Sequence, residues 1–292
     1  MKSAEEFLTK ILPSKGRYCV AAFYANRKGT HHTWCTSIEE LVKQLELKDS
    51  GADAVYHACA SYGDNRNLKG KIERTKANVA ALKSLYAEID IREDKGYKTQ
   101  EEATEALATF LETTKLPVPT IVNSGGGFHL YWPLTEDISR EVWEKYARGL
   151  KSLTAKLGFK VDVGITADAA RILRTPGTTN RKYANTIVQL VLDSPVYKLS
   201  QFSVLLLQNP EPVKKVYEKT LADPLLIANK CNQFAILRDN PSEQSGETWL
   251  ATARILAQCT DGEKLFHEWS GKDPRYNEDE ADKKWAESVK FN

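Results

Sequence analysis

Leu85-Tyr86-Ala87-Glu88-Ile89-Asp90-Ile91 is the stretch of this sequence that decides the fold and points toward a function. Side chains alternate along a β-strand, so the aliphatic residues of the stretch fall on one face, while Glu88 and Asp90 stand side by side on the other. Two carboxylates about 4 Å apart repel by roughly 4 kcal/mol at an effective dielectric constant near 20. Such a pair usually binds a divalent cation or shares a proton. A single Glu-x-Asp strand is more often a solvated face, so neighbouring motifs must give the pair its meaning.

A second stretch predicts a hairpin with a glycine turn. Residues 120–124 and 128–133 have strand patterns, and three glycines at 125–127 join them. A turn of this kind needs positive φ angles or a close approach of the backbone. Bare backbone amides beside Ser124 and His129 suit a polyanion such as a triphosphate. The turn is not a Walker loop, because no Gly-Lys-Ser/Thr follows it.

A third stretch adds a carboxylate and several cations. The apolar residues of 159–163 alternate with polar ones, which predicts a strand that carries Asp162 on one face. A basic run with a Pro-Gly turn follows, with cations at Arg171, Arg174, Arg181 and Lys182. Metal-assisted nucleotidyl transfer requires three components of this kind: carboxylates that bind metal, side chains such as serine and histidine that bind phosphate, and nearby positive charge.

In this order, the three stretches resemble the motifs of the archaeo-eukaryotic primase superfamily, and in particular those of phage and plasmid primase-polymerases. The first motif of that family is a carboxylate-x-carboxylate pair, here Glu88 and Asp90. The second is a Ser/Gly-rich turn closed by a histidine, here 124–129, and the third is an aspartate followed by an Arg-containing stretch and a Pro-Gly turn, here 162–182. The resemblance covers about residues 54–192.

The sequence departs from the family pattern at one position and leaves another open. Glu88 stands where the family usually has aspartate, and its longer side chain can alter the spacing of metal ligands. Asp168 competes with Asp162 for the role of third carboxylate, although the motif position favours Asp162.

The resemblance implies a role for each motif residue. It implies that two Mg²⁺ or Mn²⁺ ions are held by the catalytic carboxylates Glu88, Asp90 and Asp162. It implies that the incoming nucleotide is bound by Ser124, Gly126, His129, Arg171, Arg174, Asn180 and Lys182. The basic residues Arg74 and Lys76 are weaker candidates for contacts with the template backbone. Tyr131 lies near the expected position of a sugar-selecting residue, but no residue is a clear candidate for that role.

Composition limits the alternatives. A chain of 292 residues with 41% hydrophobic residues has room for one large domain and one small one. The net charge of +2 does not by itself indicate nucleic-acid binding, so binding must use local basic patches. The five cysteines lack Cys-x-x-Cys spacing, which favours reduced thiols over a zinc site. We find no signal peptide and no apolar run of about 20 residues, so we expect a cytoplasmic protein without membrane contact.

The order of predicted elements indicates an α+β chain with a helical end. Strands are predicted at 18–24, 53–59 and 186–192, and helices at 37–47, 77–83, 99–116 and 138–157. Capping boxes that begin at Ser37 and Thr99 mark the starts of two of these helices. A Pro-containing stretch at 208–212 marks a domain boundary, beyond which only helices are predicted, at 225–238, 247–259 and 278–289. We therefore predict a catalytic domain at 1–212 and a small all-α bundle at 213–292 that assists primer initiation. The resemblance implies an RNA-recognition-like sheet in the first, and a helical domain like those that follow the primase core in phage and plasmid replication proteins in the second.

The expected function is that of a DNA-dependent primase-polymerase, a nucleotidyltransferase that makes and extends primers on single-stranded DNA in phage or plasmid replication. Its expected substrates are NTPs or dNTPs, and a helicase, as a further domain or a separate protein, is a candidate partner. Two alternatives stay open. One is a polymerase of the same superfamily that extends primers but does not start them. The other is a non-catalytic replication initiator that binds single strands.

Overall fold

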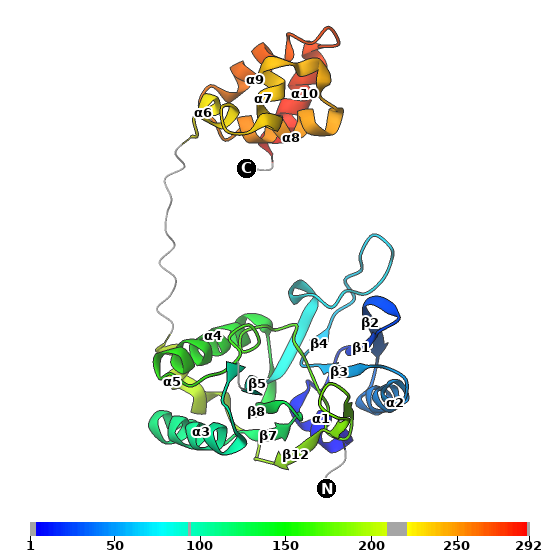
Figure 1. The fold of residues 1–292 in the computed structure, drawn as a ribbon, viewed down its shortest axis with the longest axis vertical. Helices are drawn as coiled ribbons and strands as arrows, with labels where there is room; N and C mark the ends of the chain where they lie inside the picture. Colours follow the sequence, from blue (N-terminus) through cyan, green and yellow to red (C-terminus); the bar gives the residue numbers. More distant parts are fainter. Residues whose placement is uncertain (1–3, 93–94, 209–220, 291–292) are drawn as a thin grey trace. The chain divides into compact units, whose positions relative to one another are not determined.

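The computed structural model describes residues 4–92, 95–208 and 221–290, and the backbone divides into two compact units, 1–213 and 214–292 (Figure 1). Each unit has its own hydrophobic core. The N-terminal unit mixes helices with antiparallel sheets and the C-terminal unit is helical, which confirms the expected α+β class. Residues 209–212 of the predicted boundary lie outside the described residues.

The larger sheet of the N-terminal unit is antiparallel and contains the first two motifs. Its strands follow the order β12 (Gln189–Leu192), β7 (Thr120–Asn123), β8 (Gly127–Ile138), β5 (Val79–Arg92) and β4 (Ser61–Tyr62), and β6 (Lys95–Gly96) pairs with β5. The two long central strands place Glu88 opposite His129 and Asp90 opposite Gly127. The predicted strand at 85–91 and the predicted glycine hairpin are therefore both present, on neighbouring strands.

A second antiparallel sheet brings the third motif toward the first two. Its strands follow the order β2 (Arg27–Cys35), β1 (Tyr18–Tyr24), β3 (Ala54–Ala58) and β9 (Ile172–Leu173). The two residues of β9 pair with His57 and Ala58 of β3. The chain that follows forms a small ribbon from β10 (Thr179–Asn180) and β11 (Thr186–Ile187). The basic run of the third motif is thus spread over short strands and loops.

The helices of this unit start at the residues that the sequence marks as caps. They are α1 (Ala4–Ile11), α2 (Ile38–Asp49), α3 (Gln100–Thr114), α4 (Arg140–Lys156) and α5 (Ser203–Leu206). Ser37 and Thr99 accept hydrogen bonds from the backbone N–H of Glu40 and Glu102, as expected for the two predicted capping boxes. Side-chain caps of this type stabilise a helix by about 1 kcal/mol each.

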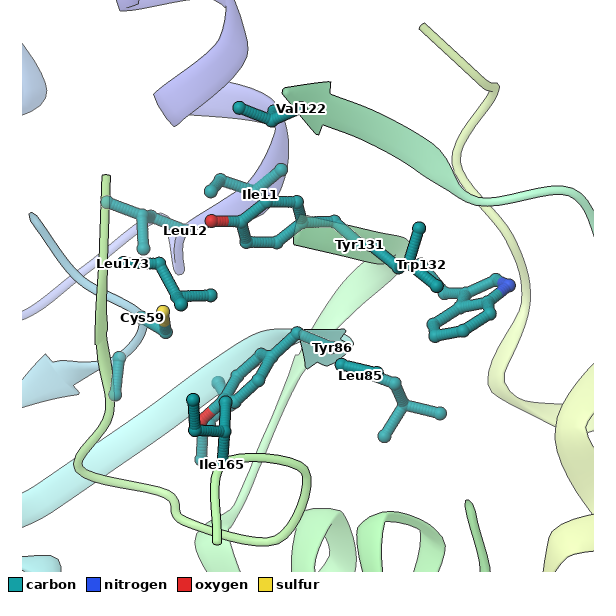
Figure 2. Packing of buried hydrophobic residues seen from close by; sticks show 14 of the residues in the cluster. Ile11, Leu12, Cys59, Leu85, Tyr86, Val122, Tyr131, Trp132, Ile165 and Leu173 are labelled. Atoms are coloured by element: carbon teal, nitrogen blue, oxygen red, sulfur yellow. The ribbon is translucent and has the colours of Figure 1, made fainter. Parts of the chain in front are cut away.

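The sheet face that carries the two carboxylates is itself largely buried. Tyr86 and Tyr131, which share that face with Glu88, have no solvent exposure. The ring of Tyr131 lies beside Ile11, the last residue of α1, and beside Leu12 (Figure 2). The hydroxyl of Tyr86 donates to the backbone carbonyl of Asp168 at 2.6 Å. The apolar residues on both faces hold the sheet rigidly, so Glu88 and its neighbours sit at the edge of a packed core.

The C-terminal unit is a bundle of short helices around aromatic residues. The helices are α6 (Pro224–Ala228), α7 (Asn232–Asp239), α8 (Gly246–Leu256), α9 (Gly262–Ser270) and α10 (Glu278–Val289). The ring of Phe266 stacks between Trp249 and Trp285, with ring centroids 5.2 Å and 5.6 Å away. Trp249 and Trp285 are therefore packing residues of this bundle. In the described parts of the chain, no helix is long and apolar enough to cross a membrane.

Three predicted elements are wrong. Residues 77–83, predicted as a helix, form a 3₁₀ turn at Lys76–Asn78 and then the start of β5. Residues 159–163, predicted as a strand, are irregular and lead into a turn. The predicted helix 225–238 is two helices, α6 and α7, with a break between them. In each case a short apolar pattern fits more than one structure, and pairing or packing with distant residues selects among them.

Candidate active site

The glycine turn between β7 and β8 is shaped by close backbone contacts. Gly127 has a φ of +152°, and a Cβ atom there would lie 1.9 Å from the carbonyl oxygen of Ile89. The backbone N–H of Ile91 donates to the carbonyl of Gly126 at 3.0 Å. The hydroxyl of Ser124 donates to the carbonyl of Gly127 at 3.0 Å. The turn therefore lies directly against the strand that carries Glu88 and Asp90, and only glycine fits at position 127.

The first two motifs meet through Glu88 and His129. Their side chains come from paired strands, and the His129 Nε2 atom lies 3.9 Å from the Glu88 Oε1 atom. His129 is 1% exposed, and the side chain of Glu88 is 20% exposed. The register of β5 and β8 places the two residues directly opposite each other.

Asp162 reaches the site without forming a strand. Its backbone N–H donates to the carbonyl oxygen of Glu88 at 2.8 Å, which docks the segment against β5. One of its carboxylate oxygens accepts from the N–H of Gly164 at 2.9 Å. The alternative third carboxylate, Asp168, lies 3.7 Å from the Nζ atom of Lys76. The geometry therefore favours Asp162 as the partner of the β5 carboxylates.

Two arginines of the third motif complete the cluster. The Arg171 Nη2 atom lies 3.9 Å from the Glu88 Oε2 atom. The Arg174 guanidinium lies over the ring of Tyr56, 4.7 Å from its centroid. The backbone of Arg171 is held in place because its carbonyl accepts from the N–H of Cys59 at 2.9 Å. The second sheet thus supplies the positive charge, and the larger sheet supplies the carboxylates.

The electrostatics of the cluster are unusual for Glu88. Burial, followed by the nearby charge of Asp90, raises the pKa of Glu88 to about 7, and Asp162 adds to the rise while Arg171 opposes it. A glutamate with this pKa is only partly ionised at neutral pH. A cation bound to the cluster would favour its ionised form.

The pKa of His129 is shifted in the opposite direction, downward from its ordinary value. Burial, together with the positive charge of Arg174, lowers the pKa of His129 to about 3. The imidazole is therefore neutral throughout the physiological range, and it is neither a cation nor a strong base. A neutral imidazole can still donate one hydrogen bond.

Several buried donors at the site lack partners. The His129 Nδ1, Arg171 Nε and Arg174 Nε atoms are all buried and make no hydrogen bond. An unsatisfied buried polar atom costs about 1–3 kcal/mol, so native proteins rarely keep several in one place without a reason. The two guanidinium N–H groups would be satisfied by the oxygens of an anionic ligand, and so would the His129 Nδ1 atom in the tautomer that protonates it.

The other predicted nucleotide-binding residues lie around the glycine turn. The Asn180 carboxamide donates to the carbonyl of Ser124, and its oxygen accepts from the N–H of Lys182 at 3.2 Å. The side chains of Ser124 and Asn180 therefore stabilise the turn from within. Lys182 is exposed, with its Nζ atom 5.5 Å from the centroid of the Tyr183 ring. Arg181 is bound to Asp49, with 3.1 Å between the Nη1 and Oδ1 atoms.

The structure also reveals a residue that the motif pattern did not indicate. A Cβ atom on Gly126 would lie 2.3 Å from the ring of Tyr183, so this tyrosine covers the glycine turn. No periodicity or motif in the sequence marks Tyr183. Tyr131, considered above as a sugar-selecting residue, is fully buried and packs against Phe7, so it has no surface to offer to a nucleotide.

The two candidate template residues lie beside the third motif. Arg74 donates to the backbone carbonyl of Ala170 and, from its Nε atom, to the Nε2 atom of His32 at 3.2 Å. Lys76 forms the ion pair with Asp168 described above. Both residues therefore sit next to the chain that leads to Arg171.

The carboxylates fit a divalent cation by their chemistry. Glu88, Asp90 and Asp162 offer only oxygen ligands, which Mg²⁺ and Mn²⁺ prefer, and the mutual repulsion that raises the pKa of Glu88 would be relieved by a cation. Within residues 4–92, 95–208 and 221–290, however, no three His, Cys, Asp or Glu side chains are close enough together to hold a metal ion as they stand. Side-chain rotation on a fixed backbone would have to bring the ligands together.

Comparison with known proteins identifies the C-terminal unit. Residues 236–290 match the family Primase C terminal 2 (PriCT-2). This match, over α8 to α10 and the end of α7, confirms the resemblance to primases that the sequence indicated. No curated protein matches the chain significantly.

Three solved structures are similar to the chain at low sequence identity. One is the archaeo-eukaryotic primase domain of the cyanophage S-2L primase-polymerase, with 16% identity, 65% of this chain and 89% of that chain covered, and a TM-score of 0.46. The second is the catalytic domain of primase RepB′ in complex with initiator DNA. It has 13% identity and a TM-score of 0.46, and the match covers 70% of this chain and 91% of that chain. The third is primase RepB′. It has 13% identity and a TM-score of 0.45, and the match covers 95% of this chain and 92% of that chain.

Proposed function

We propose that this chain, which carries a PriCT-2 segment at residues 236–290, is a DNA-dependent primase-polymerase that starts and extends primers on single-stranded DNA. Residues 1–212 would be the catalytic domain, and residues 213–292 would assist initiation. The setting would be the replication of a phage or a plasmid, with a helicase as a candidate partner.

We base this proposal on one observation above all. Three buried side-chain nitrogen atoms without hydrogen-bond partners, on His129, Arg171 and Arg174, lie beside the carboxylates Glu88, Asp90 and Asp162. A donor cluster next to a carboxylate cluster matches a metal-bound triphosphate, whose oxygens accept from the donors while its metal ions bind the carboxylates. Neither cluster alone would distinguish a polymerase from a simple anion site or cation site.

Each side chain has a defined task in this mechanism. Glu88, Asp90 and Asp162 would hold two Mg²⁺ or Mn²⁺ ions, which when bound lower the pKa of the attacking 3′-hydroxyl and stabilise the pyrophosphate leaving group. Arg174, stacked on Tyr56, would bind phosphate oxygens as a fixed cation. Arg171 would neutralise phosphate charge and also keep Glu88 ionised, because it opposes the rise in the pKa of that residue.

His129 would contribute a hydrogen bond and no proton transfer. Its low pKa keeps the ring neutral, so the tautomer that carries its proton on Nδ1 would donate to a phosphate oxygen without adding charge. The glycine turn, held by Ser124 and Asn180, would place backbone close to the same phosphates. Positioning of this kind provides most of the catalysis in phosphoryl transfer.

The helical tail would matter most when no primer exists. Starting a primer requires two nucleotides to be held at once without a duplex, which costs more translational freedom than extension. Removal of residues 213–292 should therefore reduce priming more than extension of an added primer. An equal loss of both activities would contradict this role.

The deciding experiment supplies unprimed single-stranded DNA, labelled NTPs or dNTPs, and Mg²⁺ or Mn²⁺. We expect new oligonucleotides from the wild-type protein and none from Asp90→Asn, which keeps the shape of the side chain. The matched control is Asp137→Asn at the far, exposed end of β8, which should stay active. Extension of a supplied primer without unprimed synthesis would mean a polymerase that does not initiate. A folded protein that binds DNA but incorporates nothing in either format would be a replication initiator without catalysis.

A further inference from the structure

The N-terminal unit has a groove on a surface that the proposed chemistry does not use. The groove has a volume of about 710 Å³ and lies between residues 30–34 of β2 and the segment 66–75. Ligand sites typically measure about 300–1,000 Å³, so the groove is large enough for a specific occupant. Its walls combine aromatic and basic side chains, chiefly His31, His32, Trp34, Arg66, Lys71 and Arg74.

The aromatic wall is rigid. Trp34 is half-buried on β2 and packs edge-to-face against Tyr62, with ring centroids 5.3 Å apart. The ring of His32 lies 6.4 Å from that of Trp34. Burial, with help from the charge of Arg74, lowers the pKa of His32, so this ring is neutral at physiological pH. Fixed, uncharged aromatic surfaces of this kind are platforms on which nucleobases stack.

The basic wall is also ordered by its own hydrogen bonds. The Arg66 Nη1 atom donates to the carbonyl of Gly70 at 2.8 Å. The Asn67 carboxamide oxygen accepts from the N–H groups of Lys69 and Lys71 at 2.9 Å and 3.1 Å. The turn is therefore held in one shape before any ligand binds.

The charged residues that line the groove are mostly basic. Arg66, Lys71 and Arg74 line it together with a single carboxylate, Glu73, and Arg66 also pairs with Asp64, with 3.0 Å between the Nη2 and Oδ1 atoms. Lys71 is exposed. The whole chain has a net charge of only +2, so this groove is a local concentration of positive charge suited to a polyanion.

The inner end of the groove leads to the candidate active site. Arg74 lines the groove and donates to the backbone carbonyl of Ala170, next to Arg171 in sequence. Arg171 in turn lies 3.9 Å from Glu88. Arg74 therefore connects the groove to the chain segment that carries Arg171 of the candidate active site.

We infer that this groove binds the single-stranded DNA template, with bases stacked on Trp34 and His32 and phosphates bound by Arg66, Lys71 and Arg74. This inference rests on the proposed function, since it assigns the template to a site that the nucleotide does not occupy. Stacking and phosphate contacts read no base sequence, so the groove accepts any single strand. Duplex DNA has no free base faces, so it binds more weakly.

The first test measures binding of a fluorescent oligo-dT to the full chain by anisotropy, without nucleotide or metal. We expect Trp34→Leu, which keeps an apolar side chain but removes the π-face, to weaken binding about tenfold. Trp34→Phe, which keeps a π-face, should stay within about threefold of the wild type. Equal affinity of Trp34→Leu and the wild type, with both proteins folded by circular dichroism, would overturn the inference. So would binding of duplex DNA as tightly as the single strand.

The second test uses the salt dependence of the same binding. Each phosphate contact on a single strand contributes about 0.7 to the slope of log K against log salt concentration. Lys71→Ala should lower the slope by about 0.7, while the exposed Lys156→Ala on α4 should leave it unchanged. Identical slopes for Lys71→Ala and the wild type would overturn the phosphate contact.

These measurements separate the groove from the catalytic proposal. Asp90→Asn should bind oligo-dT like the wild type, because the groove does not include Asp90. A wild type that binds through Trp34 but never incorporates nucleotides would refute the polymerase and support the groove as a single-strand site. A wild type that incorporates nucleotides, with Trp34→Leu unchanged in binding and in its use of template, would refute the groove and leave the polymerase standing.

Discussion

The two halves of the candidate site are built in different ways. Glu88 and His129 lie on long paired strands, where a continuous ladder of backbone hydrogen bonds determines their positions. Asp162 and Arg174 lie on irregular chain, held by single contacts such as the bond between the Asp162 N–H and the Glu88 carbonyl. The strand half is therefore a rigid base, and the loop half is positioned by a few long-range contacts. Substitutions that disturb the backbone should therefore destabilise the protein more in the strand half than in the loop half.

The largest expected difference between the two halves is the loss of stability when one glycine from each, Gly127 or Gly177, is replaced by alanine. A Cβ atom at Gly127 would overlap the carbonyl of Ile89, whereas one at Gly177 would meet nothing within 4 Å. We expect Gly127→Ala to lower the free energy of unfolding by at least about 3 kcal/mol. Gly177→Ala, which suffers only from its positive φ of +93°, should cost about 1 kcal/mol. Urea unfolding of both variants tests this, and similar losses would show that the hairpin is no more constrained than the loop.

The next prediction concerns the charge buried in the strand half. The folded protein raises the pKa of Glu88 from 4.5 to about 7, so between these pH values the folded state holds a proton that the unfolded state has lost. Stability from this residue is therefore present below about pH 4.5 and is lost as the pH rises through about 7. Glu88→Gln removes the effect, so the variant should match the wild type near pH 4 and exceed it by up to about 3 kcal/mol at pH 8.

Urea unfolding across this pH range, without divalent cations, provides the measurement. The exposed Glu112→Gln is the matched control and should follow the wild type at every pH. A constant difference between Glu88→Gln and the wild type from pH 4 to 8 would contradict the raised pKa. Added Mg²⁺ should stabilise the wild type at pH 8 more than Glu88→Gln, because the variant lacks one anionic ligand.

The loop half provides a matched pair of arginines. Arg174 has a buried Nε atom without a partner, whereas Arg181 is bound to Asp49. Hydrogen bonds to charged groups contribute about 1.5–3 kcal/mol, so Arg174→Gln should raise the KM for nucleotide about 10- to 100-fold. Arg181→Gln should leave KM unchanged and lower stability slightly. Steady-state kinetics on a primed template would test this, and an equal rise in KM for both variants would contradict the assignment.

The smallest expected effect belongs to His129. A neutral hydrogen bond contributes about 1 kcal/mol, so His129→Gln should raise the KM for nucleotide about five-fold with little change in kcat. Because its pKa is about 3, the ratio of variant to wild type should be constant from pH 6 to pH 8. A ratio that changes across that range would show that His129 titrates in the working enzyme.

Local pattern was sufficient where the chain follows one regular element. Alternation of apolar and polar residues identified the Glu88 strand, and the three glycines identified the hairpin. The capping boxes at Ser37 and Thr99 located two helices to within a residue of their starts. Each of these signals depends only on sterics or on hydrogen bonds between near neighbours.

Local pattern failed where distant residues decide the conformation. The alternation around Asp162 resembles a strand, yet the segment turns, with the N–H groups of Ile165 and Thr166 donating to the carbonyl of Asp162. The β2 strand, Arg27–Cys35, is mostly polar and was not predicted, because it exists through its pairing with β1. Tyr183 carries no motif signal and was not predicted either, because its contact with Gly126 is made only in the folded chain.

By itself, the sequence determined that Glu88 and Asp90 share a strand face and that a glycine turn follows the neighbouring strand, because alternation and backbone sterics act between adjacent residues. Only the tertiary structure decided that Glu88 is buried enough to hold a proton near neutral pH, that His129 is neutral, and that the Nε atoms of Arg171 and Arg174 have no hydrogen-bond partner. Apart from the charge of Asp90, these effects depend on residues far from each other in the chain, such as Glu88 and Arg171, and folding alone brings these together.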